Sequence, residues 1–375
     1  MSQDTVKHAP IRVVRPGQRH AAAGFTLVEV LIAMALGLIV LASAVTLFQQ
    51  GMDASYLVVQ RAEMQQNARA AVNLMAHDLS MAAQGGFATG GIQLPSGAGS
   101  VNEVYGCSSA GCYLAGATFP NNRLYALTPG PGVGPNILGV NSDTVLTAYI
   151  DSNFNTGQAC ATDVKVTPGT SVVVTVNPAT MNPPLADPAA GISVGDVLQL
   201  CNVNGCAAGT VTAFNAAAGT ITFKDNDPLL FNQSNAAVGT VASLGPFANP
   251  VPPAVCKNPQ LTMSRILMAT YSIDNTNPNA PRLMRQDGAH VPNPVAENIE
   301  NVQLTFDVFD DNAGVATNNL PDPIGSGFTP NQIRKINVWV SARSARQGLL
   351  RRGFERVILG TAVSPRNLSF RDRYQ

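Results

Sequence analysis

Charged side chains are scarce in this sequence. Only 12% of its 375 residues are charged, whereas 45% are hydrophobic, and a typical soluble domain has roughly twice that charged share. No basic run is interleaved with aromatic residues, as a nucleic-acid-binding surface requires, so we predict no nucleic-acid partner. The chain is long enough to bury one large hydrophobic core or two ordinary ones.

Residues that commonly carry out catalysis are also sparse. The four histidines are scattered along the chain, at His8, His20, His77 and His290. Neither an H-E-x-x-H pair nor a Walker phosphate loop occurs. We therefore expect the chain to be no enzyme and to hold no cofactor.

One acidic cluster has the composition of a cation site. Asp307, Asp310, Asp311 and Asn312 gather just before Gly314, and oxygen-rich loops of this kind can coordinate calcium. Their spacing does not match an EF-hand loop. We expect a β-turn here, with a calcium site as the alternative.

A single long apolar segment lies near the N-terminus. Residues 25–48 contain one charge, Glu29, and a helix of this length spans roughly 36 Å, enough to cross a bilayer. The segment is too long for a secretory signal peptide. An ordinary signal anchor fits the length but leaves Glu29 unexplained, because a carboxylate in a membrane helix is costly and usually marks a function.

The charges around this segment predict its orientation. Four Lys and Arg residues and one acid lie before Gly24. By the positive-inside rule this end stays in the cytoplasm, so the body after residue 49 is translocated. That body is acidic in its middle, while its last part, from Gln332 onward, has ten Lys and Arg residues against two acids. Such a distribution suits contacts with charged neighbours.

Cysteines occur only beyond the apolar segment. An even number of them in a translocated body favours disulfides over zinc, because zinc sites more often use C-x2-C spacing together with histidine. Two pairs share C-x4-C spacing, and local closure of both would leave the other two joined. The sequence does not fix the connectivity, and buried free thiols are the alternative. The six candidates are Cys107, Cys112, Cys160, Cys201, Cys206 and Cys256.

The start of the apolar segment resembles the cleavage signal of prepilins. Residues 24–29 read G-F-T-L-V-E, which matches the G-F-T-L-x-E pattern of that family. The resemblance implies that a prepilin peptidase cuts between Gly24 and Phe25 and methylates the new terminus at Phe25. It also implies that Glu29 pairs with the N-terminal amine of a preceding subunit. The leader is longer than that of many prepilins, so either this is a long-leader member or translation starts downstream of Met1.

The remaining sequence predicts an α+β protein whose long N-terminal helix packs on an antiparallel β-sheet body. Helical periodicity continues to Ala83, with Met64 and Met75 on the apolar stripe and Asp78 on another face. Beyond it, period-2 alternation marks candidate strands. The expected parts are a removed leader (1–24), a transmembrane and assembly helix (25–48), its amphipathic continuation (49–84), a Gly/Pro-rich variable loop region (85–139) and a β-rich pilin body (140–375).

Both ends of the chain resemble minor pilins of the PilW type. The C-terminal half shares that family's order of a V-E-N-(I/V) segment, here within residues 295–302, a strand, a loop and the strand of residues 333–346. The resemblance implies a minor pilin of a type IV pilus, which helps to start assembly and sits at or near the filament tip. A minor pseudopilin of a type II secretion system and a pilin-anchored adhesin or ligand-binding module are the alternatives.

The same resemblance implies partners and a location. The partners are the prepilin peptidase and methyltransferase, other minor pilins, the major pilin, the inner-membrane pilus assembly platform and membrane lipid. The chain is expected to cross the bacterial inner membrane once, with its C-terminal body in the periplasm, and then to enter the extracellular pilus.

Overall fold

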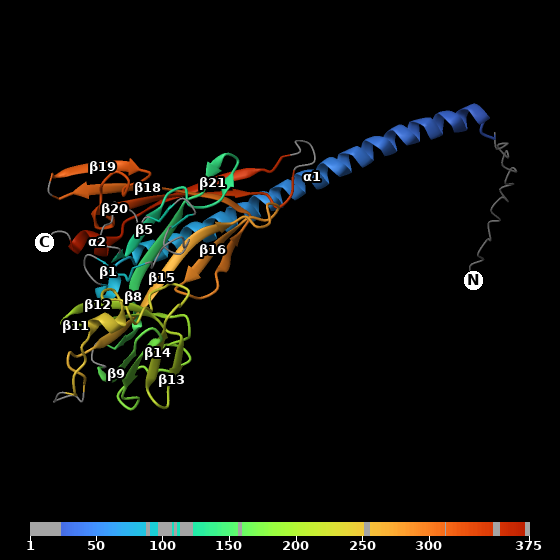
Figure 1. Cartoon of the computed structure of the whole chain (residues 1–375). Coiled ribbons are helices and arrows are strands. Elements are labelled where there is room, and N and C mark those ends of the chain that lie inside the picture. The colour runs from blue at the N-terminus through green and yellow to red at the C-terminus, as the bar shows by residue number, and fades with distance from the viewer. Residues whose placement is uncertain are drawn as a thin grey trace, which may run out of the picture. The chain divides into compact units, whose positions relative to one another are not determined.

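The computed structural model describes residues 24–87, 91–96, 107–108, 111–112, 123–156, 160–250, 256–311, 313–347 and 353–371. The chain divides into two compact units, Met1–Tyr56 and Leu57–Gln375. Helix α1 (Leu27–Ser80) contributes residues to both units, and the described strands all belong to the second unit (Figure 1).

Helix α1 ends three residues earlier than the sequence predicts. Its last residue is Ser80, and a turn then leads into the short 3-10 helix η1 (Gln84–Gly86). Ala83 already has the left-handed φ of 64°. Gly85 has a φ of 77°, and a Cβ there would lie 2.8 Å from Cβ of Ile150. The tight turn beside the sheet therefore requires glycine, and it stops the helix before the predicted boundary.

The apolar stripe predicted for the second part of α1 is confirmed. Its residues recur every three or four positions and are buried: Met64, Ala68, Val72, Met75 and Leu79. The prediction for Asp78 was wrong, because this carboxylate lies on the same packed face and is 2% exposed. Position 78 follows Met75 by three residues, so helical geometry places both side chains on one face.

The largest sheet of the second unit has nine strands. Its main order is β17-β16-β15-β11-β12-β1-β4, with β8 paired to β15 and β5 paired to β8. Only the β1–β12 pair is parallel among these described pairs. The strands are β1 (Ile92–Gln93), β4 (Arg123–Leu124), β5 (Leu127–Gly130), β8 (Thr144–Thr156), β11 (Val197–Asn202), β12 (Gly205–Thr210), β15 (Thr262–Asp274), β16 (Arg282–Asp287) and β17 (Asn293–Glu297).

Two further sheets have four antiparallel strands each. The first has the order β13 (Ala213–Asn215), β14 (Thr220–Lys224), β10 (Ser171–Val176) and β9 (Ala161–Thr167). The second has the order β19 (Val315–Leu320), β18 (Ile299–Asp310), β20 (Ile333–Arg343) and β21 (Arg356–Val363). Shorter elements are the hairpins β2 (Cys107–Ser108) with β3 (Gly111–Cys112) and β6 (Asn136–Ile137) with β7 (Val140–Asn141), the helix α2 (Arg366–Arg371), and the 3-10 helices η3 (Val241–Leu244) and η4 (Pro330–Gln332).

The body buries two hydrophobic clusters. The larger joins the stripe of α1 to β8, β15, β16, β18 and β20. The smaller lies between the β9–β10–β14 sheet and the first halves of β11 and β15, with Phe154 and Phe223 among its largest side chains. The chain changes sheet at Val211, whose N–H donates to the carbonyl of Asp196 (2.8 Å). Residues 210–214 are therefore divided between the end of β12 and the start of β13.

The region expected to be a variable loop, residues 85–139, contains sheet strands where it is described. β1, β4 and β5 all join the nine-stranded sheet, and Leu124 and Leu127 on them are fully buried. Pro129 lies within β5, which pairs only with β8, and proline is tolerated on a strand with one open edge. The prolines and glycines of this region therefore predicted a loop where the structure has edge strands.

The α1 stripe gives a direct test of the helix–body packing. Met75→Ala is expected to lower the free energy of unfolding by about 2–5 kcal/mol, because Met75 is fully buried and its loss leaves a cavity. The matched control Asn73→Ala, on the exposed side of the same helix, should change it by less than about 0.5 kcal/mol. Chemical denaturation of the full chain in detergent measures both. Equal effects from the two variants would contradict this packing.

Candidate functional site

The predicted cleavage point lies in an open stretch of chain. Gly24 directly precedes the α1 region, and a Cβ built on it meets no atom within 4 Å. Phe25 is 85% exposed. Both residues of the bond that a prepilin peptidase would cut are therefore uncovered within the first unit.

Glu29 closes the N-terminal turn of α1. Its Oε2 accepts hydrogen bonds from the backbone N–H and the hydroxyl of Thr26, each at 3.0 Å. The N–H of Glu29 donates in return to Oγ1 of Thr26 (3.3 Å). This reciprocal capping box satisfies donors that an α-helix otherwise leaves unpaired at its start. The single carboxylate of the apolar segment thus has local partners within its own chain.

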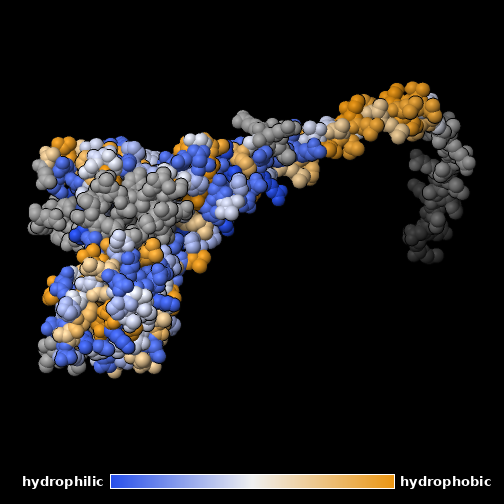
Figure 2. Space-filling model, viewed as in Figure 1, coloured by the Kyte–Doolittle hydropathy of each residue, from blue (hydrophilic) through white to orange (hydrophobic). Residues whose placement is uncertain are grey.

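The part of α1 that follows Glu29 has the properties of a membrane segment. An 18-residue window of the helix has a mean hydropathy of 2.7, and none of that window is buried. On the face seen in Figure 2 this part of the helix is hydrophobic. Large apolar side chains point outward along it, including Leu31, Leu38 and Phe48 at 58–69% exposure. By length and composition the helix can cross a membrane.

A buried polar cluster attaches the second part of α1 to the sheet. One carboxylate oxygen of Asp78 accepts hydrogen bonds from the hydroxyl of Tyr271 and from Nε of Arg285, both at 2.7 Å. The other oxygen contacts the hydroxyl of Tyr149 and Nδ1 of the exposed His77, at 3.4 and 3.3 Å. The partners come from β8, β15 and β16, so a single helix residue is held by three strands.

The ionisation of this cluster follows from its burial. Burial, and then the Asp78 carboxylate, raise the pKa values of Tyr149 and Tyr271, so both hydroxyls stay protonated and donate. Burial opposes the charge of Arg285, but the Asp78 carboxylate raises its pKa overall. The cluster therefore joins the carboxylates of Asp78 and Asp287 to one guanidinium and, at Asp78, to two tyrosine hydroxyl donors, so it attaches the helix to the sheet.

The structure settles two of the possible disulfides. Cys201 and Cys206 are joined across the turn between β11 and β12, and Cys160 is joined to Cys256, 96 residues away. Cys107 and Cys112 are opposite each other in the β2–β3 hairpin register; their side chains lie outside what is described. Local C-x4-C closure is thus observed for one of the two pairs.

The acidic cluster considered for calcium is engaged in ion pairs. Asp307 pairs with Lys335 at 3.0 Å, and Asp311 pairs with Arg334 at 2.9 Å. Burial alone would raise the pKa of Asp307, but the Asn319 amide and Lys335 hold that pKa below its usual value. Both cations come from β20, so they are distant in sequence and adjacent in space. Asn312 lies outside the described residues, and Asp310 accepts a bond from the N–H of Ala313 (3.3 Å).

A G-x-S-x-G pattern at Gly191–Gly195 is a motif that the sequence reasoning missed. A nucleophile elbow requires a strand before the serine and a helix after it. Ser193 instead lies in a turn that leads into β11, and its N–H donates to Asp196 (2.8 Å). Asp196 also contacts His290 at 2.8 Å and Arg265 at 3.4 Å. The G-x-S-x-G segment is therefore a turn that the contacts of Asp196 stabilise. Among the described residues, no group of three or more His, Cys, Asp or Glu can hold a metal ion.

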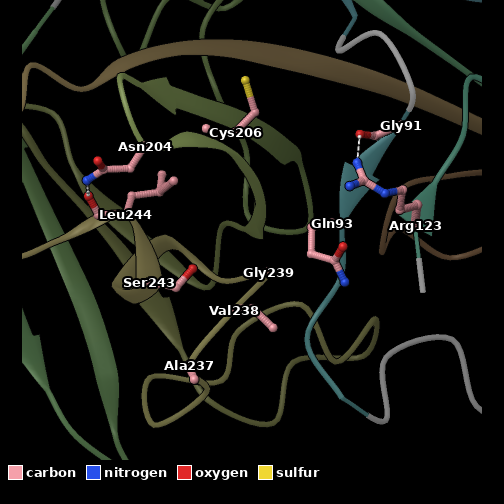
Figure 3. A pocket seen from close by; sticks show the side chains of 11 residues that line it. Gly91, Gln93, Arg123, Asn204, Cys206, Ala237, Val238, Gly239, Ser243 and Leu244 are labelled. Atoms are coloured by element: carbon pink, nitrogen blue, oxygen red, sulfur yellow. Dashed lines mark hydrogen bonds between the residues drawn. The ribbon is translucent and has the colours of Figure 1, made fainter. Parts of the chain in front are cut away.

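The middle of the body contains a hollow of about 490 Å³ (Figure 3). It is lined by β1, β4, the β11–β12 turn and residues 237–244. Two of its polar side chains bond to its own wall: Arg123 donates to the carbonyl of Gly91 (3.1 Å) and Asn204 to that of Leu244 (3.0 Å). These donors are therefore already occupied by the backbone.

The Asp78 cluster predicts a large effect of a single substitution. Asp78→Ala is expected to lower the free energy of unfolding by about 3–5 kcal/mol, because it removes the closest partner of the half-buried Arg285, whose other carboxylate partner, Asp287, lies at 3.7 Å. Tyr271→Phe removes one hydrogen bond to the carboxylate and should cost about 1.5–3 kcal/mol. The control Glu63→Ala, exposed on the same helix, should cost less than about 0.5 kcal/mol. Denaturant unfolding of the full chain measures all three, and an Asp78→Ala protein as stable as the control would contradict the attachment role.

Comparisons with known proteins agree with the N-terminal geometry. Residues 19–45 match the family model of the prokaryotic N-terminal methylation motif. No curated protein and no solved structure matches the chain. The motif supports a type IV pilin-like or pseudopilin protein, and together with the apolar helix it is consistent with anchoring in a membrane.

Proposed function

We propose that this chain is a minor pilin of a type IV pilus, similar to the PilW type, that helps to initiate assembly and sits at or near the filament tip. Its role is structural rather than enzymatic. It is made as a prepilin, cut between Gly24 and Phe25, and methylated on Phe25. Its body faces the periplasm before the subunit enters the extracellular filament.

The observation that carries this proposal is the N-terminal segment. A methylation motif at residues 19–45 leads into an exposed apolar helix whose one charge is Glu29. A helix exposed over its whole apolar surface needs lipid or other helices around it. The same segment therefore serves first as a membrane anchor and then as the packing element of a filament.

Features of the body support a minor rather than a major subunit. Residues 57–375 form one compact unit with two hydrophobic clusters, and a major pilin body is normally much smaller. Its partners are then other minor pilins, the major pilin, the inner-membrane assembly platform and the prepilin peptidase.

Glu29 is proposed to direct the entry of the subunit into the filament. In a membrane its carboxylate is costly. The Thr26 capping box supplies hydrogen bonds to it but no positive charge. The free amine of a neighbouring mature subunit is a cation in the same apolar layer. Pairing the two stabilises the correct register, because an unpaired buried charge costs several kcal/mol.

This pairing makes the effect of one substitution specific. Glu29→Val should leave cleavage intact, so that the mature N-terminal peptide still begins at methylated Phe25 by mass spectrometry. The amount of the subunit in sheared filaments should fall by at least about tenfold, because the amine loses its partner. Normal entry of the variant into filaments would refute the pairing, and a mature protein that begins before Phe25 would refute the processing.

A deletion strain tests the proposed function itself. We expect the major pilin to be lost from the sheared surface fraction, while secretion of enzymes through the type II system continues. Lost secretion with normal piliation would instead assign the chain to a secretion pseudopilus. Normal results in both assays would favour a pilin-anchored adhesin and contradict a role in initiating assembly.

A further inference from the structure

Strand β21 is an open edge of its sheet. Among the strands that the structure describes, the order β19-β18-β20-β21 leaves one side of β21 without a neighbour. All eight of its residues pair with β20 on the other side, from Arg343↔Arg356 to Ile336↔Val363. The side-chain pattern of residues 356–363 does not predict this strand, and none of the functional assignments above uses it.

The hydrogen-bond pattern shows which backbone groups of β21 face outward. The N–H of Ser344 donates to the carbonyl of Glu355 (2.8 Å), whereas the N–H of Arg343 donates away from β21, to Asn298 (2.9 Å). In an antiparallel ladder these directions alternate. The N–H and C=O groups of Ile358, Gly360 and Ala362 therefore point away from β20. Within the described part of the chain, no hydrogen bond from another segment reaches them.

The other described sheet edges carry features that block pairing. β17 contains Pro294 and β5 contains Pro129. β9 carries Asp163 and Lys165, and β19 pairs with β18 through a bulge. β4 and β13 are only two and three residues long. Charges, prolines, bulges and shortness are the usual protections of an edge, and β21 after Arg356 has none of them.

Two large apolar side chains are exposed on the outer face beside this edge. Ile358 is 69% exposed, and Trp339 on β20 is 38% exposed. A Cβ on Gly360 would lie 2.9 Å from Cδ1 of Trp339, so the indole lies over the glycine. An exposed tryptophan next to unpaired backbone is the composition of a protein–protein contact, and it lies where the side chains of an added strand would lie.

The charges at the two ends of β21 select the kind of strand that fits. Arg346 and Arg356 lie near its start, where Glu300 pairs with both Arg343 and Arg356 and Glu355 pairs with Arg61, so basic side chains still outnumber acidic ones at this end. Arg366 follows the other end of the strand. An antiparallel pairing of β21 with a second copy would bring the Arg356 end of one chain to the Arg366 end of the other. Like charges in neighbouring strands are destabilising. A strand of uncharged residues with acidic flanks is complementary instead.

We propose that β21 accepts an extended strand from a different protein, with uncharged side chains between acidic flanks, by β-strand addition. The backbone of Ile358, Gly360 and Ala362 supplies the hydrogen bonds, and Trp339 and Ile358 supply the apolar contact. The inference does not depend on the role as a minor pilin, since a secretion or adhesion subunit would present the same edge.

Site-specific photo-crosslinking in the source cells tests the proposal. A benzoylphenylalanine probe at Ala362 is expected to form an adduct with another protein, whereas the same probe at Ala316, an exposed alanine on edge strand β19, is expected to form none. Probes at Ile358 and Ala362 should attach to partner residues about four positions apart, because both lie on one face of the ladder. The attached peptide should be uncharged with acidic flanks. Equal adducts at both edges, no adduct, an adduct with a second copy, or attachment without this spacing would overturn the proposal.

A pair of variants separates the backbone bond from the side chain. Ile358→Pro removes the outward N–H and the side chain but no bond to β20, whereas Ile358→Ala removes only the side chain. With the probe at Ala362, Ile358→Pro should reduce the adduct at least about tenfold relative to Ile358→Ala, since it leaves a partner carbonyl unpaired. Equal yields from the two variants would overturn the proposal. Denaturant unfolding of both variants checks the fold. If Ile358→Pro is destabilised, the spacing between the partner residues that the probes at Ile358 and Ala362 attach to decides whether the proposal holds.

Discussion

The body depends on one buried ionic contact, that of Asp78 with Arg285 and two tyrosines. Apolar burial of the α1 stripe supplies most of the attraction between helix and sheet, but apolar contacts alone allow the helix to slide by one turn. A carboxylate that is 2% exposed does not allow this, because any other register would bury it away from Arg285 and the two tyrosines. The apolar stripe therefore holds the helix on the sheet, and the polar cluster fixes its register.

The same helix carries a second carboxylate, Glu29, which is exposed rather than buried. Asp78 finds its partners on β8, β15 and β16 of its own chain, whereas Glu29 bonds only to Thr26 among the described residues. The body from residue 57 onward thus supplies the partners of this buried carboxylate itself. The N-terminal segment leaves an anion and a continuous apolar surface for other molecules. This contrast divides the chain into a part that folds by itself and a part that assembles.

The sequence predicts features that rest on local periodicity or on a contiguous motif. The apolar segment, the stripe from Met64 to Leu79 and strands such as β10 and β18 belong to this class, because side-chain patterns of 3.6 or 2 residues report them directly. Features that depend on residues distant in sequence could not be predicted. Asp78 was placed on an exposed face, since a charge on its own argues for solvent until Arg285 is known to lie opposite. β5 was concealed by Pro129 and Gly130, and β21 carries no alternation strong enough to mark it. The ion pairs of Asp307 and Asp311 come from a neighbouring strand, which local composition does not report.

The disulfide between Cys160 and Cys256 has a mechanical consequence. The chain leaves β8 and returns to β15 at adjacent points, where Lys257 bonds to Ala161 (2.7 Å) and Ala161 to Leu261 (3.1 Å). A subunit anchored at one end and loaded at a distant surface carries tension along its backbone. That tension crosses from Cys160 to Cys256 through the covalent bond, so the 96-residue excursion, with roughly 330 Å of contour length, is not pulled out. The part of the smaller hydrophobic cluster that lies between the two cysteines is thereby shielded from a force that is applied outside the bridge.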